Sequence, residues 1–85
     1  MARYIKIYEN GQITHELTFK GEKFSFKMIE CAYGMKSDNK GHEEQISKRF
    51  GIDIEELEGI GVGDLWVSDD DEIAEILENL EGLED

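Results

Sequence analysis

Hydrophobic and polar residues alternate strictly along the first third of the chain. Residues 4–8 read Tyr-Ile-Lys-Ile-Tyr, and apolar side chains or His15 return at every second position from Ile13 to Phe19. A period of two residues is typical of a strand with one buried face. The dipeptide Asn10-Gly11, a strong hairpin signal, separates the two runs. The sequence therefore predicts two antiparallel strands joined by a tight turn.

A third alternating run, Phe-Ser-Phe-Lys-Met at residues 24–28, follows a second expected turn at Gly21-Glu22. We therefore expect residues 1–31 to form a three-stranded β-meander with one covered face. The alternation ends after this segment, and Ser-Asp-Asn-Lys-Gly at residues 37–41 is typical of an exposed loop. We expect the whole stretch from residue 32 to 41 to be irregular.

Helical spacing begins at His42, because Ile46 and Phe50 are four residues apart and a glycine follows as a stop signal. Asp53 is a candidate N-cap for a further short helix, so residues 42–58 are expected to contain two short helices. Residues 64–68, Asp-Leu-Trp-Val-Ser, are rich in side chains that favour strands. We expect a fourth strand there.

Residues 69–83 have the clearest helical pattern in the chain. Ser68 or Asp69 is the expected N-cap, and apolar residues recur on one helical face at Ile73, Ile76, Leu77, Leu80 and Leu83. The opposite face is acidic. The element order β-β-β-α-α-β-α predicts an α+β fold in a single domain, residues 1–85. It consists of a small antiparallel sheet of three to four strands with helices packed on one face.

The net charge of −12, from 21 acidic and nine basic residues, is distributed unevenly. Residues 1–49 contain every Lys and Arg and carry a balance of +2, whereas residues 50–85 carry −14. Phosphate binding depends on Lys and Arg. The charge therefore argues against direct binding to nucleic acid or to an anionic membrane, and it favours a cationic partner.

The predicted C-terminal helix contains no basic residue, so its carboxylates repel one another along one face. A basic protein surface would compensate this charge when bound. The candidate partner-binding residues are Asp69, Asp70, Asp71, Glu72, Glu75, Glu78 and Glu81, with Glu55, Glu56 and Glu58 as a second acidic track. The alternative is an acidic face that serves solubility alone.

In composition the chain resembles the small acidic inhibitors with which phages and mobile elements block nucleic-acid-handling enzymes, including restriction inhibitors and anti-CRISPR proteins. This resemblance implies a non-enzymatic inhibitor that mimics nucleic acid on a basic groove. The alternative is a small structural or assembly domain that forms a homo-oligomer, such as a homodimer, through its sheet edge or a helix. We also expect Tyr4, Lys6 and Tyr8 on the outward sheet face, either in an exposed patch with Lys20 and Lys27 or, for the tyrosines, at a sheet edge or dimer contact.

The sequence contains no motif for catalysis, a cofactor or a metal. Asp69 to Glu72 lack the alternate spacing and glycine turn of a calcium loop. His15, Cys31 and His42 lack the usual spacing of zinc ligands, and we expect His15 to be half-buried on the apolar face of the second strand. A single thiol, with no signal peptide or membrane segment, favours a cytoplasmic location.

Overall fold

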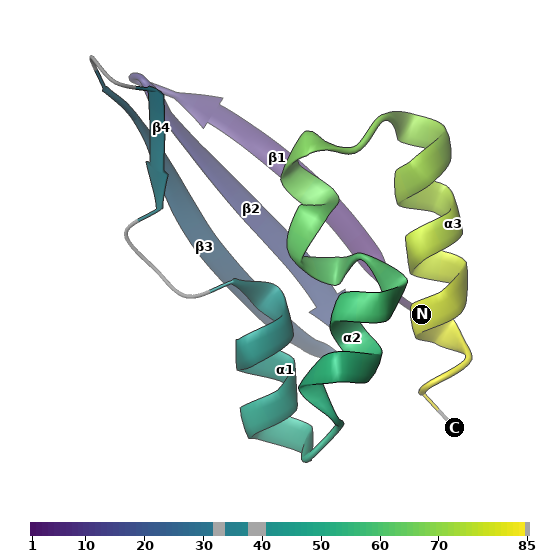
Figure 1. Cartoon of the computed structure of the whole chain (residues 1–85). Coiled ribbons are helices and arrows are strands. Elements are labelled where there is room, and N and C mark those ends of the chain that lie inside the picture. Colours follow the sequence, from purple (N-terminus) through teal and green to yellow (C-terminus); the bar gives the residue numbers. More distant parts are fainter. Residues whose placement is uncertain (32–33, 38–40, 85) are drawn as a thin grey trace.

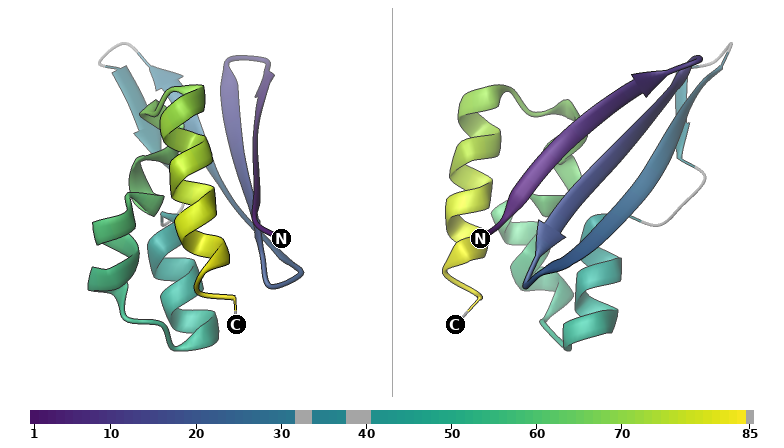
Figure 2. Two further views of the ribbon diagram at one scale, coloured as in Figure 1. Left: turned by 90° about the vertical axis from the view of Figure 1, so that its right-hand side faces the viewer. Right: turned by 180° about the vertical axis from the view of Figure 1, so that it is seen from behind.

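The computed structural model describes the backbone of residues 1–31, 34–37 and 41–84, and the side chains of residues 1–27 and 41–84. Its four strands form one antiparallel sheet in sequence order, and its helices lie on one face of that sheet (Figure 1, Figure 2). This confirms the expected α+β fold. The elements are β1 (Arg3–Glu9), β2 (Gln12–Phe19), β3 (Glu22–Cys31), β4 (Gly34–Ser37), α1 (His42–Phe50), α2 (Ile54–Ile60), the 3₁₀ helix η1 (Val62–Val67) and α3 (Asp70–Glu81).

Two tight turns set the register of the first three strands. Asn10 and Gly11 have φ angles of 50° and 76°, the left-handed conformation of a type I′ hairpin turn. Lys20 and Gly21 form the second turn, one residue earlier than expected, with φ angles of 52° and 77°. Because both turns have two residues, the strands pair without a shift. Tyr4 therefore lies opposite Leu17, which lies opposite Phe24.

This register corrects the prediction for β1. Tyr4, Lys6 and Tyr8 share the sheet face of Leu17 and so lie on the helix side, not on the outward face. Ile5 and Ile7 lie on the open face instead, with 52% and 38% of their surfaces exposed. Lys27 is also on the open face. The expected patch that combined it with the three β1 residues does not form.

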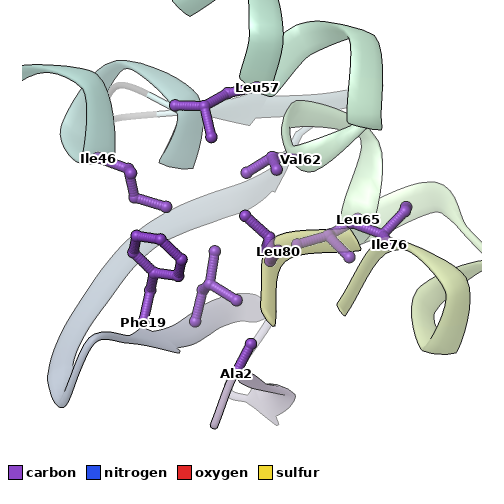
Figure 3. Packing of buried hydrophobic residues seen from close by; sticks show 9 residues of the cluster. Ala2, Phe19, Ile46, Leu57, Val62, Leu65, Ile76 and Leu80 are labelled. Atoms are coloured by element: carbon purple, nitrogen blue, oxygen red, sulfur yellow. The ribbon is translucent and has the colours of Figure 1, made fainter. Parts of the chain in front are cut away.

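Between the sheet and the helices lies an apolar core to which almost every element contributes. Phe19 extends from β2 towards the helices, and Leu57 and Leu80 meet it from α2 and α3 (Figure 3). Leu17 of β2 belongs to the same cluster. All four are fully buried. Burying a side chain of this size contributes about 1.5–3 kcal/mol to the free energy of unfolding. The complete cluster is Ala2, Leu17, Phe19, Ile46, Leu57, Val62, Leu65, Ile76 and Leu80.

The strand expected at residues 64–68 is wrong, because this segment belongs to the 3₁₀ helix η1. The backbone N–H of Asp64 donates to the carbonyl of Gly61 at 3.0 Å, and the N–H of Ser68 donates to that of Leu65 at 3.3 Å. Val62 and Leu65, three residues apart, both point into the core. Side chains at this spacing lie above one another in a 3₁₀ helix, so core packing outweighs the strand preference of the aromatic segment.

The fourth strand comes from the segment that was expected to be irregular. β4 pairs with the last part of β3, from Met28 opposite Ser37 to Cys31 opposite Gly34. Four residues are too few to show a period of two in the sequence, so the pairing with β3 defines this strand. The predictions for the Cys31 side chain and for residues 38–40 lie outside the described residues.

The helix ends agree with the capping signals. Gly51, at φ 71°, ends α1, and the Asp53 carboxylate accepts from the N–H of Glu55 at 3.1 Å to begin α2. α2 extends to Ile60, two residues beyond the predicted end, where Gly61 at φ 98° provides the left-handed cap. Asp69 caps α3, which ends at Glu81. In the described ranges, each helix is too short or too polar to cross a membrane.

Two glycines, Gly41 just before α1 and Gly63 in η1, make room for one buried carboxylate. A Cβ atom on Gly63 would lie 2.6 Å from Oε2 of Glu43, and one on Gly41 would lie 2.9 Å from the same atom. The Glu43 carboxylate therefore fits between the start of α1 and η1 because both neighbours lack side chains. Its Oε2 has no hydrogen-bond partner among the described atoms.

Candidate partner-binding surface

The seven acidic candidates at 69–81 are all exposed. Ile76 and Leu80 turn towards the core, which leaves the opposite side of α3 to the carboxylates. Asp69 lies just before the helix, where its carboxylate accepts from the N–H of Glu72 at 2.8 Å. The acidic residues of the first turn are stabilised by the helix dipole, whereas those near the C-terminal end are not. The predicted acidic face of this helix is therefore present in the structure.

The three candidates on α2, Glu55, Glu56 and Glu58, are exposed as well. Leu57 is the fully buried residue of this short helix, and the glutamates surround it on the solvent side. α2 and α3 are not adjacent along the chain, but η1 joins them on one side of the molecule (Figure 1). We call the exposed carboxylates on and beside these two helices the acidic layer.

A surface hollow of about 360 Å³ lies where α2, η1 and α3 meet. Glu72 and Glu75 line it from α3, and Asp64 lines it from η1. Ile60 and Ile76 contribute apolar surface to the same hollow. Three carboxylates around aliphatic side chains form a site that fits a long basic side chain, because Lys and Arg carry an apolar stem below a charged head.

The hollow divides the predicted residues into two groups. Glu72 and Glu75 belong to it, whereas the α2 glutamates do not line it. Asp70 is on another flank of α3, where it shares a smaller hollow with Tyr4, Lys6 and Ile73. Asp64 is not among the ten predicted partner-binding residues, and η1 brings it to the hollow. Gly61 ends α2, and Asp64 follows it by three residues at the start of the next turn. This glycine is the local sequence signal for the turn that places Asp64 at the hollow.

None of the ten candidate carboxylates takes part in an ion pair within the part of the chain that the structure describes. The ion pairs found there lie elsewhere. Arg49 Nη2 is 2.9 Å from Glu22 Oε1, and Lys23 Nζ is 3.9 Å from Glu16 Oε2. The Met1 amine is 3.0 Å from Glu84 Oε2 and, by hydrogen bonding, lowers the pKa of that carboxyl group. The basic side chains that the structure describes therefore form no ion pair with the acidic layer.

A cluster of aromatic and imidazole rings lies between the sheet and the helices. This histidine cluster consists of Tyr4, His15, Phe26, His42 and Trp66. His15 is fully buried, not half-buried as expected, and so is His42. The Tyr4 hydroxyl lies 2.6 Å from His15 Nδ1, and His42 Nε2 lies 3.2 Å from the His15 carbonyl oxygen. The His15 and Phe26 rings stack with centroids 4.7 Å apart, and the His42 ring meets Phe26 edge-on at 4.6 Å.

These contacts define the protonation of both imidazoles. A carbonyl oxygen accepts, so His42 donates through Nε2–H and leaves Nδ1 without a proton. A Tyr4 hydroxyl that donates to Nδ1 of His15 places the His15 proton on Nε2. Burial lowers the pKa of each histidine to about 4, with a smaller contribution to His15 from Lys6. Both rings are therefore neutral at pH 7.

The described residues around the histidine cluster were considered as metal ligands. Among the described residues no group of three or more His, Cys, Asp or Glu side chains is placed to hold a metal ion. His15 Nε2 and His42 Nδ1 are buried without a hydrogen-bond partner among the described atoms. Both histidine rings therefore lie inside the protein, whereas the carboxylates of the acidic layer are exposed.

Comparison with known proteins gave no match: no protein-family model, no curated protein and no solved structure matches this chain.

Proposed function

We propose that the protein is a non-enzymatic inhibitor that binds the basic surface of a nucleic-acid-binding protein through its acidic layer. The residues that carry this function are the ten carboxylates on and beside α2 and α3, with Asp64 added by the hollow. The protein competes with nucleic acid for the basic groove, as phage and mobile-element inhibitors of restriction or CRISPR enzymes do.

The main support is the absence of basic partners for these exposed carboxylates in the described part of the chain. Solvent-exposed helices ordinarily mix acidic with basic residues, because opposite charges at i,i+4 stabilise a helix and like charges destabilise it. The carboxylates of α3 repel one another, and the helix contains no basic residue that would compensate them. A basic partner would remove this repulsion on binding, which gives the acidic layer a role beyond solubility.

The arrangement around the hollow supports a protein partner in particular. Nucleic-acid-binding grooves present Lys and Arg side chains at spacings set by phosphates. Neighbouring turns of α3 place carboxylates about 5–6 Å apart, a comparable spacing. The hollow adds apolar surface from Ile60 and Ile76, which would contact the stem of one basic side chain.

The proposal is tested by affinity capture from a lysate of the source cells, followed by mass spectrometry and elution with duplex DNA. The rim variant D64N/E72Q/E75Q removes the charges of the hollow. The matched variant D71N/E78Q/E81Q removes the same number of charges from α3 outside it. We expect wild type to capture a nucleic-acid-binding protein that DNA displaces, and both variants to lose binding, with the rim variant losing more.

Salt dependence provides a second measurement on the same complex. Binding through exposed carboxylates weakens steeply between about 0.05 and 0.5 M salt, because the screening length falls well below about 10 Å. Capture that withstands 0.5 M salt, or that DNA does not reverse, would contradict the proposal. Equal capture by wild type and both variants would place the binding surface elsewhere.

A further inference from the structure

β1 is an edge strand of the sheet, and its sequence reads almost the same in both directions. It pairs with β2 on one side, and its other side has no neighbour among the described strands. Around Lys6 the strand is symmetric: an isoleucine follows on each side, then a tyrosine. Its ends, Arg3 and Glu9, carry opposite charges. A strand with this pattern is complementary to an antiparallel copy of itself.

We propose that the protein forms a two-fold symmetric dimer in which β1 pairs antiparallel with β1 of a second copy, centred on Lys6. The two sheets then become one continuous sheet of eight strands. Arg3 lies opposite Glu9 of the second copy, and Ile5 lies opposite Ile7. By symmetry each pair occurs twice on the open face, where opposite charges and β-branched side chains that face each other stabilise a sheet.

The backbone of β1 is in the correct phase for this pairing. A two-residue turn is flanked by a hydrogen-bonded pair, here Glu9 and Gln12, and such pairs alternate along the ladder. The N–H and C=O groups of Tyr4, Lys6 and Tyr8 therefore point towards the free edge. When the pairing is centred on Lys6, Lys6 faces Lys6 of the second copy and Tyr4 faces Tyr8, so outward-pointing backbone groups of one copy face those of the other. They form about six backbone hydrogen bonds.

Other registers lose part of this match. A shift of one residue sets groups that point outward against groups that point inward, so the ladder cannot form. A shift of two residues restores the ladder but separates Arg3 from Glu9 of the second copy. The register centred on Lys6 is the one that combines backbone pairing with both ion pairs.

The edge of β1 lacks two of the usual devices against strand pairing, although it carries a third, the central lysine Lys6. Proline and β-bulges are common devices on edge strands. The chain contains no proline, and β1 pairs with β2 over seven consecutive positions without a bulge. Tyr8, 70% exposed, and Ile5 and Ile7 leave apolar surface open at this edge. Dimer formation would cover it.

Lys6 is the one unfavourable residue, because two copies of its ammonium group approach each other at the axis. Asp70 shares a surface hollow with Lys6, Tyr4 and Ile73 on the helix side of the sheet. The Asp70 carboxylate of each copy is therefore placed to compensate the charge. Within the dimer, this hollow also lies beside Tyr8 of the second copy, which is opposite Tyr4.

The charge distribution and the shape favour β1 over other contact surfaces. Two molecules of net charge −12 repel, so they approach best where the chain is least acidic, and β1 carries a net charge of +1. α3 flanks the first half of β1, whereas the second half extends clear of the helices (Figure 1, Figure 2). In an antiparallel pair, the half of β1 beside α3 in each copy faces the half of β1 that extends beyond the helices in the other copy.

The test uses sedimentation velocity of the full chain over a range of concentrations in 0.3 M salt, which screens the overall repulsion. The single variants R3E and E9R each place like charges at both ends of the interface. We expect the dissociation constant to rise about 10-fold or more in each. The matched control K27E makes the same charge change as R3E on the open face, away from the edge, and should leave the dimer unchanged.

Recombining the charges identifies the register. The double variant R3E/E9R restores both ion pairs and should dimerise like wild type. A mixture of the R3E and E9R proteins should form a heterodimer tighter than either homodimer. An additional measurement needs no variant: methyl contacts between Ile5 and Ile7 in a dimer of differently labelled wild-type chains.

The proposal fails if wild type remains monomeric at all concentrations, if K27E weakens the dimer as much as R3E, or if the mixture shows no preferred heterodimer. These measurements vary β1 and the open face of the sheet and leave every carboxylate of the acidic layer unchanged. A negative result here therefore leaves the proposed inhibitor function intact, and loss of that function leaves the dimer intact.

Discussion

The apolar core and the histidine cluster occupy the same layer between sheet and helices, but different interactions hold them together. Phe19, Leu57 and Leu80 are stabilised by removal of apolar surface from water, which does not depend on pH. His15 and His42 are equally buried, and they rely on neutral rings with one specific tautomer each. The stability that the apolar core provides is therefore insensitive to acid, whereas the stability that the histidine cluster provides is not.

This difference shows why a small domain can bury polar rings at all. The Tyr4 hydroxyl and the His15 carbonyl satisfy one nitrogen of each imidazole, and stacking on Phe26 covers the rings. The stabilisation holds while the rings stay neutral. Four predictions separate the two halves of the interior, in order of decreasing effect.

Removing the largest side chain of the apolar core should have the greatest effect. Phe19→Ala creates a cavity between β2 and Phe50, whose ring lies 5.5 Å away, and should lower the free energy of unfolding by about 4 kcal/mol. The loss should be the same at pH 7 and pH 5.5, as measured by urea unfolding. A loss that grows in acid would contradict the division between the two halves.

Acid should destabilise the wild-type protein through the histidine cluster. A histidine whose pKa is about 4 when folded and about 6.5 when unfolded binds fewer protons in the folded state. Stability is therefore full above about pH 6.5 and is lost as the pH falls towards 4. For the two rings together we expect a loss of about 2.5 kcal/mol between pH 7 and pH 5.5.

The control for this titration is His42→Gln, which retains an N–H donor for the His15 carbonyl and removes one titrating ring. The slope of stability against pH should fall to about half of the wild-type slope. An unchanged slope would contradict a contribution of His42 to the acid sensitivity.

Tyr4→Phe tests the hydrogen bond that holds His15. The variant keeps the aromatic ring but leaves Nδ1 of His15 buried without its donor, which costs about 1–2 kcal/mol. Tyr8→Phe is the matched control, since Tyr8 is mostly exposed and should change stability by less than about 0.5 kcal/mol. Equal effects of the two variants in thermal unfolding would contradict this role of Tyr4.

The smallest effect is expected at Gly63, beside the first turn of α1 that carries His42. Gly63→Ala places a methyl group against the Glu43 carboxylate, which is the flexible end of its side chain and can move. We expect a loss below about 1 kcal/mol. In the double variant G63A/E43A the contact is gone, so the Gly63 substitution should cost less there than it does alone. A double-variant cycle measures this difference.

Much of the fold was predictable from the sequence because its signals are local. The Asn10-Gly11 turn, the Asp53 and Asp69 caps and the periodic apolar face of α3 each depend on residues a few positions apart. The face of β1 was also predictable, although it was predicted incorrectly. A two-residue turn at 10–11 sets Tyr4 opposite Leu17, which indicates the helix side directly.

The remaining elements depend on contacts between distant segments. β4 exists through its pairing with β3, and η1 replaces the expected strand because Val62 and Leu65 pack into a core formed by other elements. The predicted acidic residues are exposed as expected, but the hollow that unites Asp64, Glu72 and Glu75 arises from the packing of η1 between α2 and α3. Short-range patterns do not contain this information.

Trp66 has a further consequence for experiments. It is the single tryptophan of the chain and belongs to η1, and its ring meets His15 edge-on with centroids 6.3 Å apart. A protonated imidazole quenches indole fluorescence at such a distance. The intrinsic emission of the protein therefore reports the charge state of one buried ring, so that its titration can be followed in dilute solution without any label.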